Sequence, residues 1–268
     1  MRFTLSLVAA LILAADAMPP WGGTVWITPN ILTDGDPSSL DRVTYTGRGM
    51  RDYWDGKTVV TVEAYLFDAV YGGHRIEFRA HPDYGSREAA QEEVDRYAHI
   101  LGRLPMVLLT GSHAAELGTV VGGFAGGTEG IYIMDSIDGL KQIDNGFIEE
   151  ILIHEGGHTS LDRFHADSPD WLAAQEVDGN FISTYARDNP NREDIAETFI
   201  NWFAVRYKPE RVTSHYLNTT LDTVPNRLAY FDEQNFDMSP YTLAPTSVPA
   251  LPFLIWFEDW LRRDRVER

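Results

Sequence analysis

Apolar positions in the first half of the chain follow the short periods of a β-sheet. Residues 59–68 and 75–80 have the composition and alternation of two strands, and the Tyr-Gly-Gly sequence at 71–73 between them predicts a hairpin turn. The short apolar runs 106–109 and 130–135 predict two further strands. The stretch 118–130, which contains six glycines, predicts a mobile loop between them.

Helical spacing marks a second kind of element. Residues 87–101 have the apolar period of a helix, with Ser86 in the N-cap position and Gly102 at its end. This helix is expected to cover one face of the sheet.

From position 143 onward the apolar pattern becomes helical throughout. Ile143, Phe147, Ile151 and Leu152 recur at helical spacing and lead directly into His154. Further helices are predicted at 171–180, 192–207 and about 253–262. The pattern therefore predicts an α+β fold with a strand-rich N-terminal half, a backing helix and a helical C-terminal half. We expect a single domain over 18–268, with subdomains 18–142 and 143–268.

The first 17 residues have the features of a signal peptide. Arg2 precedes an almost unbroken apolar run at 3–15, and Ala-Asp-Ala at 15–17 has the small-x-small form of a cleavage site. The run is short for a membrane span, although a retained N-terminal anchor is the alternative. We expect cleavage before Met18 and a secreted or periplasmic protein with no membrane partner.

Composition and charge narrow the range of functions. The 268-residue chain has no cysteine, so disulfides and a thiol nucleophile are excluded, and the core, with or without a metal, must hold the fold. Its formal net charge of −18 would repel nucleic acids and anionic membranes. The oligomeric state is not indicated.

The sequence His-Glu-Gly-Gly-His at 154–158 is the strongest chemical signal in the chain. On a helix, His154 and His158 lie on the same face and can bind one cation, and Glu155 is placed to act on a metal-bound water. The alternative is an ordinary helix with two surface histidines. Two consecutive glycines, which weaken a helix, favour a position where backbone or substrate approaches closely.

Catalytic zinc usually takes a third protein ligand. Asp162, His165 and Asp178 are candidates, but rigid helix geometry disfavours the first two. Glu193 and Glu197, four residues apart in the predicted helix 192–207, form a better pair, in which one carboxylate binds the metal and the other orients a ligand histidine. The alternative is that acidic residues simply favour the start of that helix.

These motifs together resemble a known family. An HExxH helix followed by a Glu-x-x-Ala-Glu helix is similar to the gluzincins, and in particular to the anthrax lethal factor-like catalytic domain, over about residues 148–207. The chain as a whole also resembles small exported zincin-like proteins. The resemblance implies one zinc ion bound by His154, His158 and Glu193, with Glu197 supporting the ligands. It also implies that Tyr185 donates a hydrogen bond to the oxyanion formed in catalysis.

The expected function is hydrolysis of peptide bonds, with Glu155 as the general base and a peptide or protein as the substrate. In zincins an edge strand holds the peptide by strand addition, and residues 131–134 occupy that place in chain order. An ordinary core strand is the alternative for this segment. The rival functions are a non-enzymatic exported binding protein with structural zinc, and a zinc hydrolase that acts on another substrate.

Overall fold

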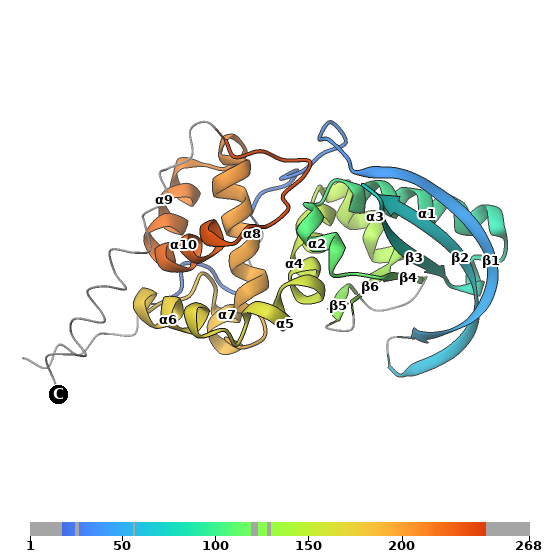
Figure 1. Cartoon of the computed structure of the whole chain (residues 1–268), viewed down its shortest axis with the longest axis horizontal. Helices are drawn as coiled ribbons and strands as arrows, with labels where there is room; N and C mark the ends of the chain where they lie inside the picture. Colours follow the sequence, from blue (N-terminus) through green and yellow to red (C-terminus); the bar gives the residue numbers. More distant parts are fainter. Residues whose placement is uncertain (1–17, 25–26, 56, 119–122, 128–129, 245–268) are drawn as a thin grey trace, which may run out of the picture.

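The protein is an α+β structure with one six-stranded sheet and a group of helices beside it (Figure 1). The computed structural model describes residues 18–24, 27–55, 57–118, 123–127 and 130–244. The expected signal peptide at 1–17 and the expected helix at 253–262 therefore lie outside the described residues. None of the described helices combines the length and apolar character needed to cross a membrane.

The sheet is mixed, with the strand order β1-β2-β3-β4-β6-β5. The first three strands are antiparallel, β3, β4 and β6 run parallel, and β5 is antiparallel to β6. The strands are β1 (Leu40–Trp54), β2 (Val59–Tyr71), β3 (His74–Ala80), β4 (Ala114–Gly118), β5 (Ala125–Gly127) and β6 (Ile131–Asp135).

The predicted hairpin is confirmed. β2 and β3 pair from Tyr71 and His74 outward, and Gly72 and Gly73 between them have φ values of 52° and 90°. A two-residue hairpin turn of type I′ requires positive φ at both central residues, and glycine adopts positive φ without strain.

Helix α1 (Arg87–Gly102) covers one face of this sheet, as predicted. Ser86 Oγ accepts a hydrogen bond from Ala89 N, which fixes the start of the helix. Val94, Tyr97 and Leu101 are fully buried against the sheet, because they share one face of the helix.

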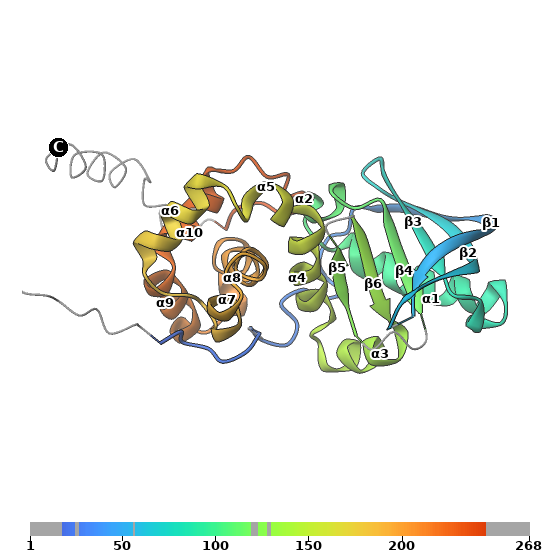
Figure 2. The same ribbon diagram turned by 90° about the horizontal axis from the view of Figure 1, so that it is seen from below.

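The remaining helices follow in the chain and are mostly in its second half. They are α2 (Met106–Thr110), α3 (Ser136–Asn145), α4 (Ile148–Ser160), α5 (Asp162–His165), α6 (Pro169–Asp178), α7 (Thr184–Asp188), α8 (Asp194–Tyr207), α9 (Ser214–Thr223) and α10 (Pro225–Glu233). Helix α4 lies between the sheet and the helices α6 to α10 (Figures 1 and 2), and Figure 2 looks nearly along α8, with α6, α7, α9 and α10 around it. Every residue of α8 from Asp194 to Arg206 is buried, so α8 is the centre of the helical half.

Two predicted elements were wrong in type or extent. Residues 106–109 form the helix α2, not a strand, because a run of four apolar residues does not distinguish the two and the extended Pro105 leads into a helical turn. The helical pattern from Ile143 is interrupted, since Gly146 has φ 75° and separates α3 from α4.

We expected residues 131–134 to form the edge strand of the sheet, but the structure differs. Residues 131–134 belong to β6, which is paired on both sides and is a core strand, as the alternative held. The last strand in the order is β5, which forms inside the glycine-rich stretch that we expected to be a loop throughout. Strand addition to 131–134 is therefore excluded by the pairing.

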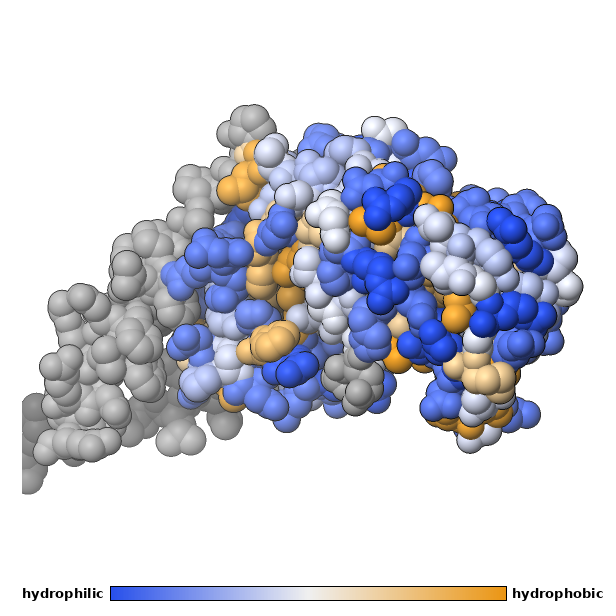
Figure 3. All heavy atoms as spheres, turned by 45° about the vertical axis from the view of Figure 1, so that its right-hand side comes forward, coloured by the Kyte–Doolittle hydropathy of each residue, from blue (hydrophilic) through white to orange (hydrophobic). Residues whose placement is uncertain are grey.

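On the face in Figure 3, hydrophilic residues predominate and hydrophobic residues gather in small separate patches. The apolar side chains instead form a continuous core that extends from the sheet through α4 into the helical half.

A buried ionic triad joins three helices of the helical half. Arg227 on α10 contacts Asp178 on α6 at 2.9 Å and Asp194 on α8 at 2.7 Å, and all three side chains are fully buried. Asp194 follows Glu193 directly, so this triad also fixes the position of the first turn of α8.

We predict that Arg227→Met destabilises the protein by roughly 3–5 kcal/mol, because it leaves two buried carboxylates without their cation. Thermal and urea unfolding measure this loss. Arg75→Met, which removes a pair whose arginine is 59% exposed, is the control and should cost less than about 1 kcal/mol. Equal losses for the two variants would contradict the role of the triad.

Candidate metal centre

Both histidines of the metal motif lie on the buried helix α4. Leu152 and Ile153 anchor this helix in the core, and His154 and His158 are 7% and 9% exposed. Their ring centroids are 4.8 Å apart, as expected for residues four apart on one helix face. The alternative of two surface histidines is therefore wrong.

The two glycines between the histidines permit close packing on both sides of α4. A Cβ atom at Gly156 would lie 2.5 Å from Tyr132 Oη of β6 and 3.0 Å from Leu108 Cβ of α2. A Cβ atom at Gly157 would lie 2.9 Å from the Cα atom of Ala196 in α8. The glycines are thus required by the approach of the protein's own helices and sheet, and the approach to α8 brings Glu193 to the histidines.

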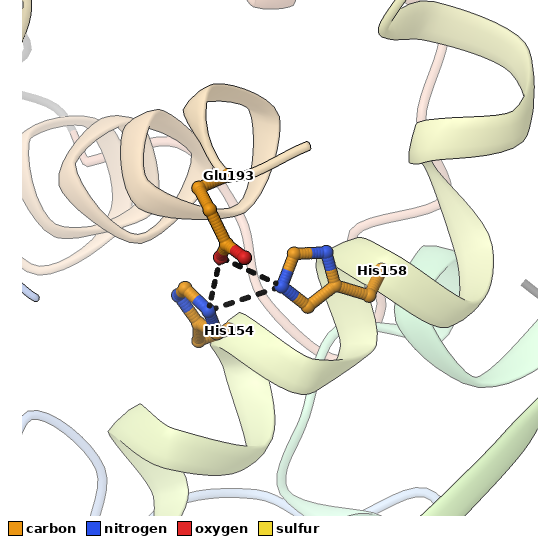
Figure 4. Close-up of side chains that lie close together, drawn as sticks. All are labelled: His154, His158 and Glu193. Atoms are coloured by element: carbon orange, nitrogen blue, oxygen red, sulfur yellow. Dashed lines mark hydrogen bonds and ion pairs between the residues drawn. The ribbon is translucent and has the colours of Figure 1, made fainter. Parts of the chain in front are cut away.

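Glu193 is the third member of the cluster, as predicted. It occupies the N-cap position of α8, one residue before the helix begins, and it is 2% exposed. Figure 4 shows its carboxylate pointing at both imidazoles. Glu193 Oε2 lies 3.4 Å from His154 Nε2 and 3.2 Å from His158 Nε2, and the two Nε2 atoms are 3.1 Å apart.

The geometry of these three atoms fits a metal ion. Two ligands bound at about 2.0–2.1 Å to a tetrahedral zinc ion lie about 3.3–3.4 Å apart, which is close to the three observed separations. Glu193 Oε2 is buried and makes no hydrogen bond with the described residues. A cation between the three atoms would satisfy this oxygen and both facing nitrogens, so the cluster could bind a metal ion.

Each of the two histidines also has a carboxylate near its other ring nitrogen. His158 Nδ1 donates to Asp162 Oδ2 at 2.7 Å, and His154 Nδ1 lies 3.3 Å from Glu197 Oε1. Glu197 is itself held by Ser183 Oγ, which donates to Oε2 at 2.8 Å. The hydrogen bond to Asp162 fixes the tautomer and orientation of the His158 imidazole. Glu197 lies beside His154 Nδ1, which is the position in which we expected a supporting carboxylate.

The sequence allowed Asp162 to orient one of the two histidines, but a helix cap or an ion pair was the favoured interpretation. The structure shows that Asp162 accepts a hydrogen bond from His158 Nδ1. The other candidate ligands lie elsewhere: Asp178 pairs with Arg227, and His165 Nδ1 bonds to Tyr230 Oη at 2.6 Å.

Tyr185 lies beside the cluster and faces the carboxylate of Glu193. Its hydroxyl donates to Glu193 Oε1 at 3.0 Å, and Arg192 Nε lies 3.1 Å from the same oxygen. Ser183 caps α7 by accepting from Ala186 N, which places the tyrosine in the first turn. Tyr185 therefore orients Glu193 in this structure, and its role toward an oxyanion stays a prediction.

Charge at the centre strongly favours a cation. Burial disfavours the charged imidazole of His158, but Asp162 and Glu193 outweigh it and raise its pKa to about 10. Burial likewise opposes ionisation of Glu193, yet the two histidines hold the pKa of its carboxyl well below the usual range. The same carboxylates that favour a proton here would favour a metal ion.

A cleft of about 280 Å³ opens beside the cluster. His154, Glu155 and Tyr185 line it, together with Thr24 of the N-terminal segment and Phe124 before β5. The cleft brings Glu155 and one ligand histidine to a common space that a small group or side chain can enter.

Comparisons with protein-family models, with curated proteins and with solved structures found no match for this chain.

We predict that Gly157→Ala destabilises the protein by about 1–3 kcal/mol, because the new methyl group meets the backbone of α8. In an ordinary helix interior the same change stabilises by up to about 1 kcal/mol. Gly35→Ala is the control, since its Cβ would meet only ordinary contact at 3.6 Å. A melting temperature for Gly157→Ala at or above that of the wild type would contradict the close packing.

We also predict that Asp162→Ala weakens metal binding by roughly 10–100-fold, because His158 loses the partner that orients its ring. Competition with a chromogenic chelator measures the zinc dissociation constant. Asp167→Ala, an exposed change on the same segment, should leave it unaltered. Unchanged affinity in Asp162→Ala would show that the hydrogen bond does not support the site.

Proposed function

We propose that this chain is an exported zinc-dependent metallopeptidase with a zincin-like fold of the gluzincin type. The observation that carries the proposal is the triangle of His154 Nε2, His158 Nε2 and Glu193 Oε2, with sides of 3.1, 3.2 and 3.4 Å. Two imidazoles and one carboxylate are the donor set of a catalytic zinc site that keeps one position open.

The bound zinc ion would polarise a scissile carbonyl and lower the pKa of a water molecule in the open position. The protein's own part is to hold the three ligands at tetrahedral spacing, with Asp162 and Glu197 behind the histidines. The burial of α4 keeps these groups oriented before a substrate enters.

Glu155 would act as the general base. It follows His154 on α4 and lines the cleft with it, and its charge is close enough to contribute to the raised pKa of His158. A carboxylate in this position can accept a proton from the attacking water and pass it to the leaving amine. A purely structural metal site has no need of such a group, which favours the enzyme over the binding protein.

Strand β5 is the proposed place for the peptide backbone. It ends the strand order, and a Cβ atom at Gly126 would lie 1.9 Å from the carbonyl oxygen of Glu155, so β5 rests directly on α4. An extended peptide that pairs with the outer edge of β5 would run past the metal cluster. Tyr185, which now donates to Glu193 Oε1, would then be close enough to serve the oxyanion.

We predict that Glu155→Gln retains zinc but lowers peptide hydrolysis by at least about 100-fold, because the amide cannot accept the proton. A peptide library digested by the zinc-loaded protein and read by mass spectrometry measures turnover. Glu176→Gln, an exposed change on α6, should leave turnover intact. Near-normal hydrolysis by Glu155→Gln would exclude this mechanism, and no hydrolysis by the wild type would favour a binding protein.

A further inference from the structure

The cleft beside the metal cluster is lined by acidic residues. Asp138, Glu150 and Glu155 are among its lining side chains, and no lysine or arginine is among the lining residues that the structure describes. Acidic groups gathered on a surface often have no ligand, but Glu150 differs from the others in its environment.

Glu150 is a buried carboxyl group without a counter-ion at one of its oxygens. The residue is 1% exposed, and its Oε1 accepts a hydrogen bond from Ile27 N at 2.5 Å. Its Oε2 has no hydrogen-bond partner among the described residues. A buried polar atom without a hydrogen-bond partner lowers the stability of the fold, unless a ligand supplies the partner.

Glu149, the preceding residue on α4, is paired with an arginine. Glu149 is also buried, and its Oε1 contacts Arg103 Nη2 at 2.5 Å. Glu150 has no such arginine among the described residues, and burial, together with the charge of Glu197, raises its pKa to about 8. Among the described residues, Glu149 therefore has a cationic partner and Glu150 has none.

Apolar side chains complete the walls of the cleft. Phe124, Ile151 and Ile200 line it along with the acidic groups. Lysine and arginine have an aliphatic stem and a charged end, and they bury the stem against apolar surface while the charge finds a polar partner. A cleft with apolar walls and carboxyl groups matches both parts of such a side chain.

We propose that this cleft binds a lysine or arginine side chain of the peptide substrate, with Glu150 as its charge partner. The inference rests on the proposed function, because His154 and Glu155 line the same cleft and would place the basic residue beside the scissile bond. When the cation enters, Glu150 gives up its proton to solvent and pairs with the cation as a carboxylate. Glu150 is then a specificity-determining residue, and it takes no part in the chemical step.

The first test compares two peptides that differ only in lysine or norleucine beside the cleaved bond. We expect the wild type to cleave the lysine peptide with a kcat/KM at least about tenfold higher, which corresponds to about 1.4 kcal/mol. In Glu150→Gln, which keeps the shape and the acceptor for Ile27 N, the ratio should fall to about two or less. Asp144→Asn, an exposed change on α3, is the control and should keep the wild-type ratio.

The second test measures binding without turnover. Calorimetry with the zinc-loaded Glu155→Gln protein should show the lysine peptide bound at least about fivefold tighter than the norleucine peptide, and adding Glu150→Gln should abolish the difference. Should the double variant fail to fold, zinc-free Glu150→Gln, which cannot turn the peptides over, should bind the two peptides equally. Equal affinities in Glu155→Gln, or a preference that survives Glu150→Gln, would overturn the inference.

The two tests separate the inference from the proposed function. A binding preference that depends on Glu150, without hydrolysis by the wild type, would support the cleft and exclude the peptidase. Hydrolysis without any preference for basic residues would support the peptidase and exclude the basic-residue cleft.

Discussion

The structure depends on the close approach of α4 and α8 at Gly157 and Ala196. A methyl group at position 157 would lie 2.9 Å from the backbone of α8, so only glycine allows this separation. Because α4 carries both histidines and α8 begins after Glu193, the contact sets the distances between the imidazole nitrogens and the Glu193 carboxylate. The packing of α4 against α8, two helices that are far apart in the sequence, therefore determines the geometry of the candidate metal centre.

The charges near this contact are arranged so that few are left without a partner. The triad of Arg227, Asp178 and Asp194 holds the first turn of α8, and Asp162 orients His158. Buried ion pairs contribute little net free energy to folding, but removing one partner destabilises the protein strongly. Such pairs therefore permit few other arrangements of the helices that carry them. Among the described residues, Glu193 Oε2 and Glu150 Oε2 are two buried carboxylate oxygens without a hydrogen-bond partner. Glu193 faces the two histidines, and Glu150 lines the cleft beside them.

Much of the candidate site could be predicted from sequence because its residues lie at fixed helical spacing. The spacing of four between His154 and His158 placed them on one face, and the Glu193–Glu197 pair preceded a clear apolar helix pattern. Asp162 was visible at the same spacing, but its function depends on a ring orientation that sequence does not contain. The hydrogen bond from Tyr185 to Glu193, and the position of Ile27 at Glu150, depend on tertiary contacts between distant segments.

The fold was predictable where the pattern was strong and local. The hairpin at 71–73 and helix α1 carry their own turn and cap residues. The strands β1 and β4 were not predicted, because β1 is rich in polar residues on both faces and β4 contains alanine and glycine.

The central question is whether His154, His158 and Glu193 together bind one zinc ion, and the zinc content of the purified protein is the measurement that decides this. Wild type purified beside Glu193→Ala should contain about one zinc per chain, with zinc lost or much weakened in the variant. No zinc in the wild type after reconstitution, or equal zinc in both proteins, would contradict the account.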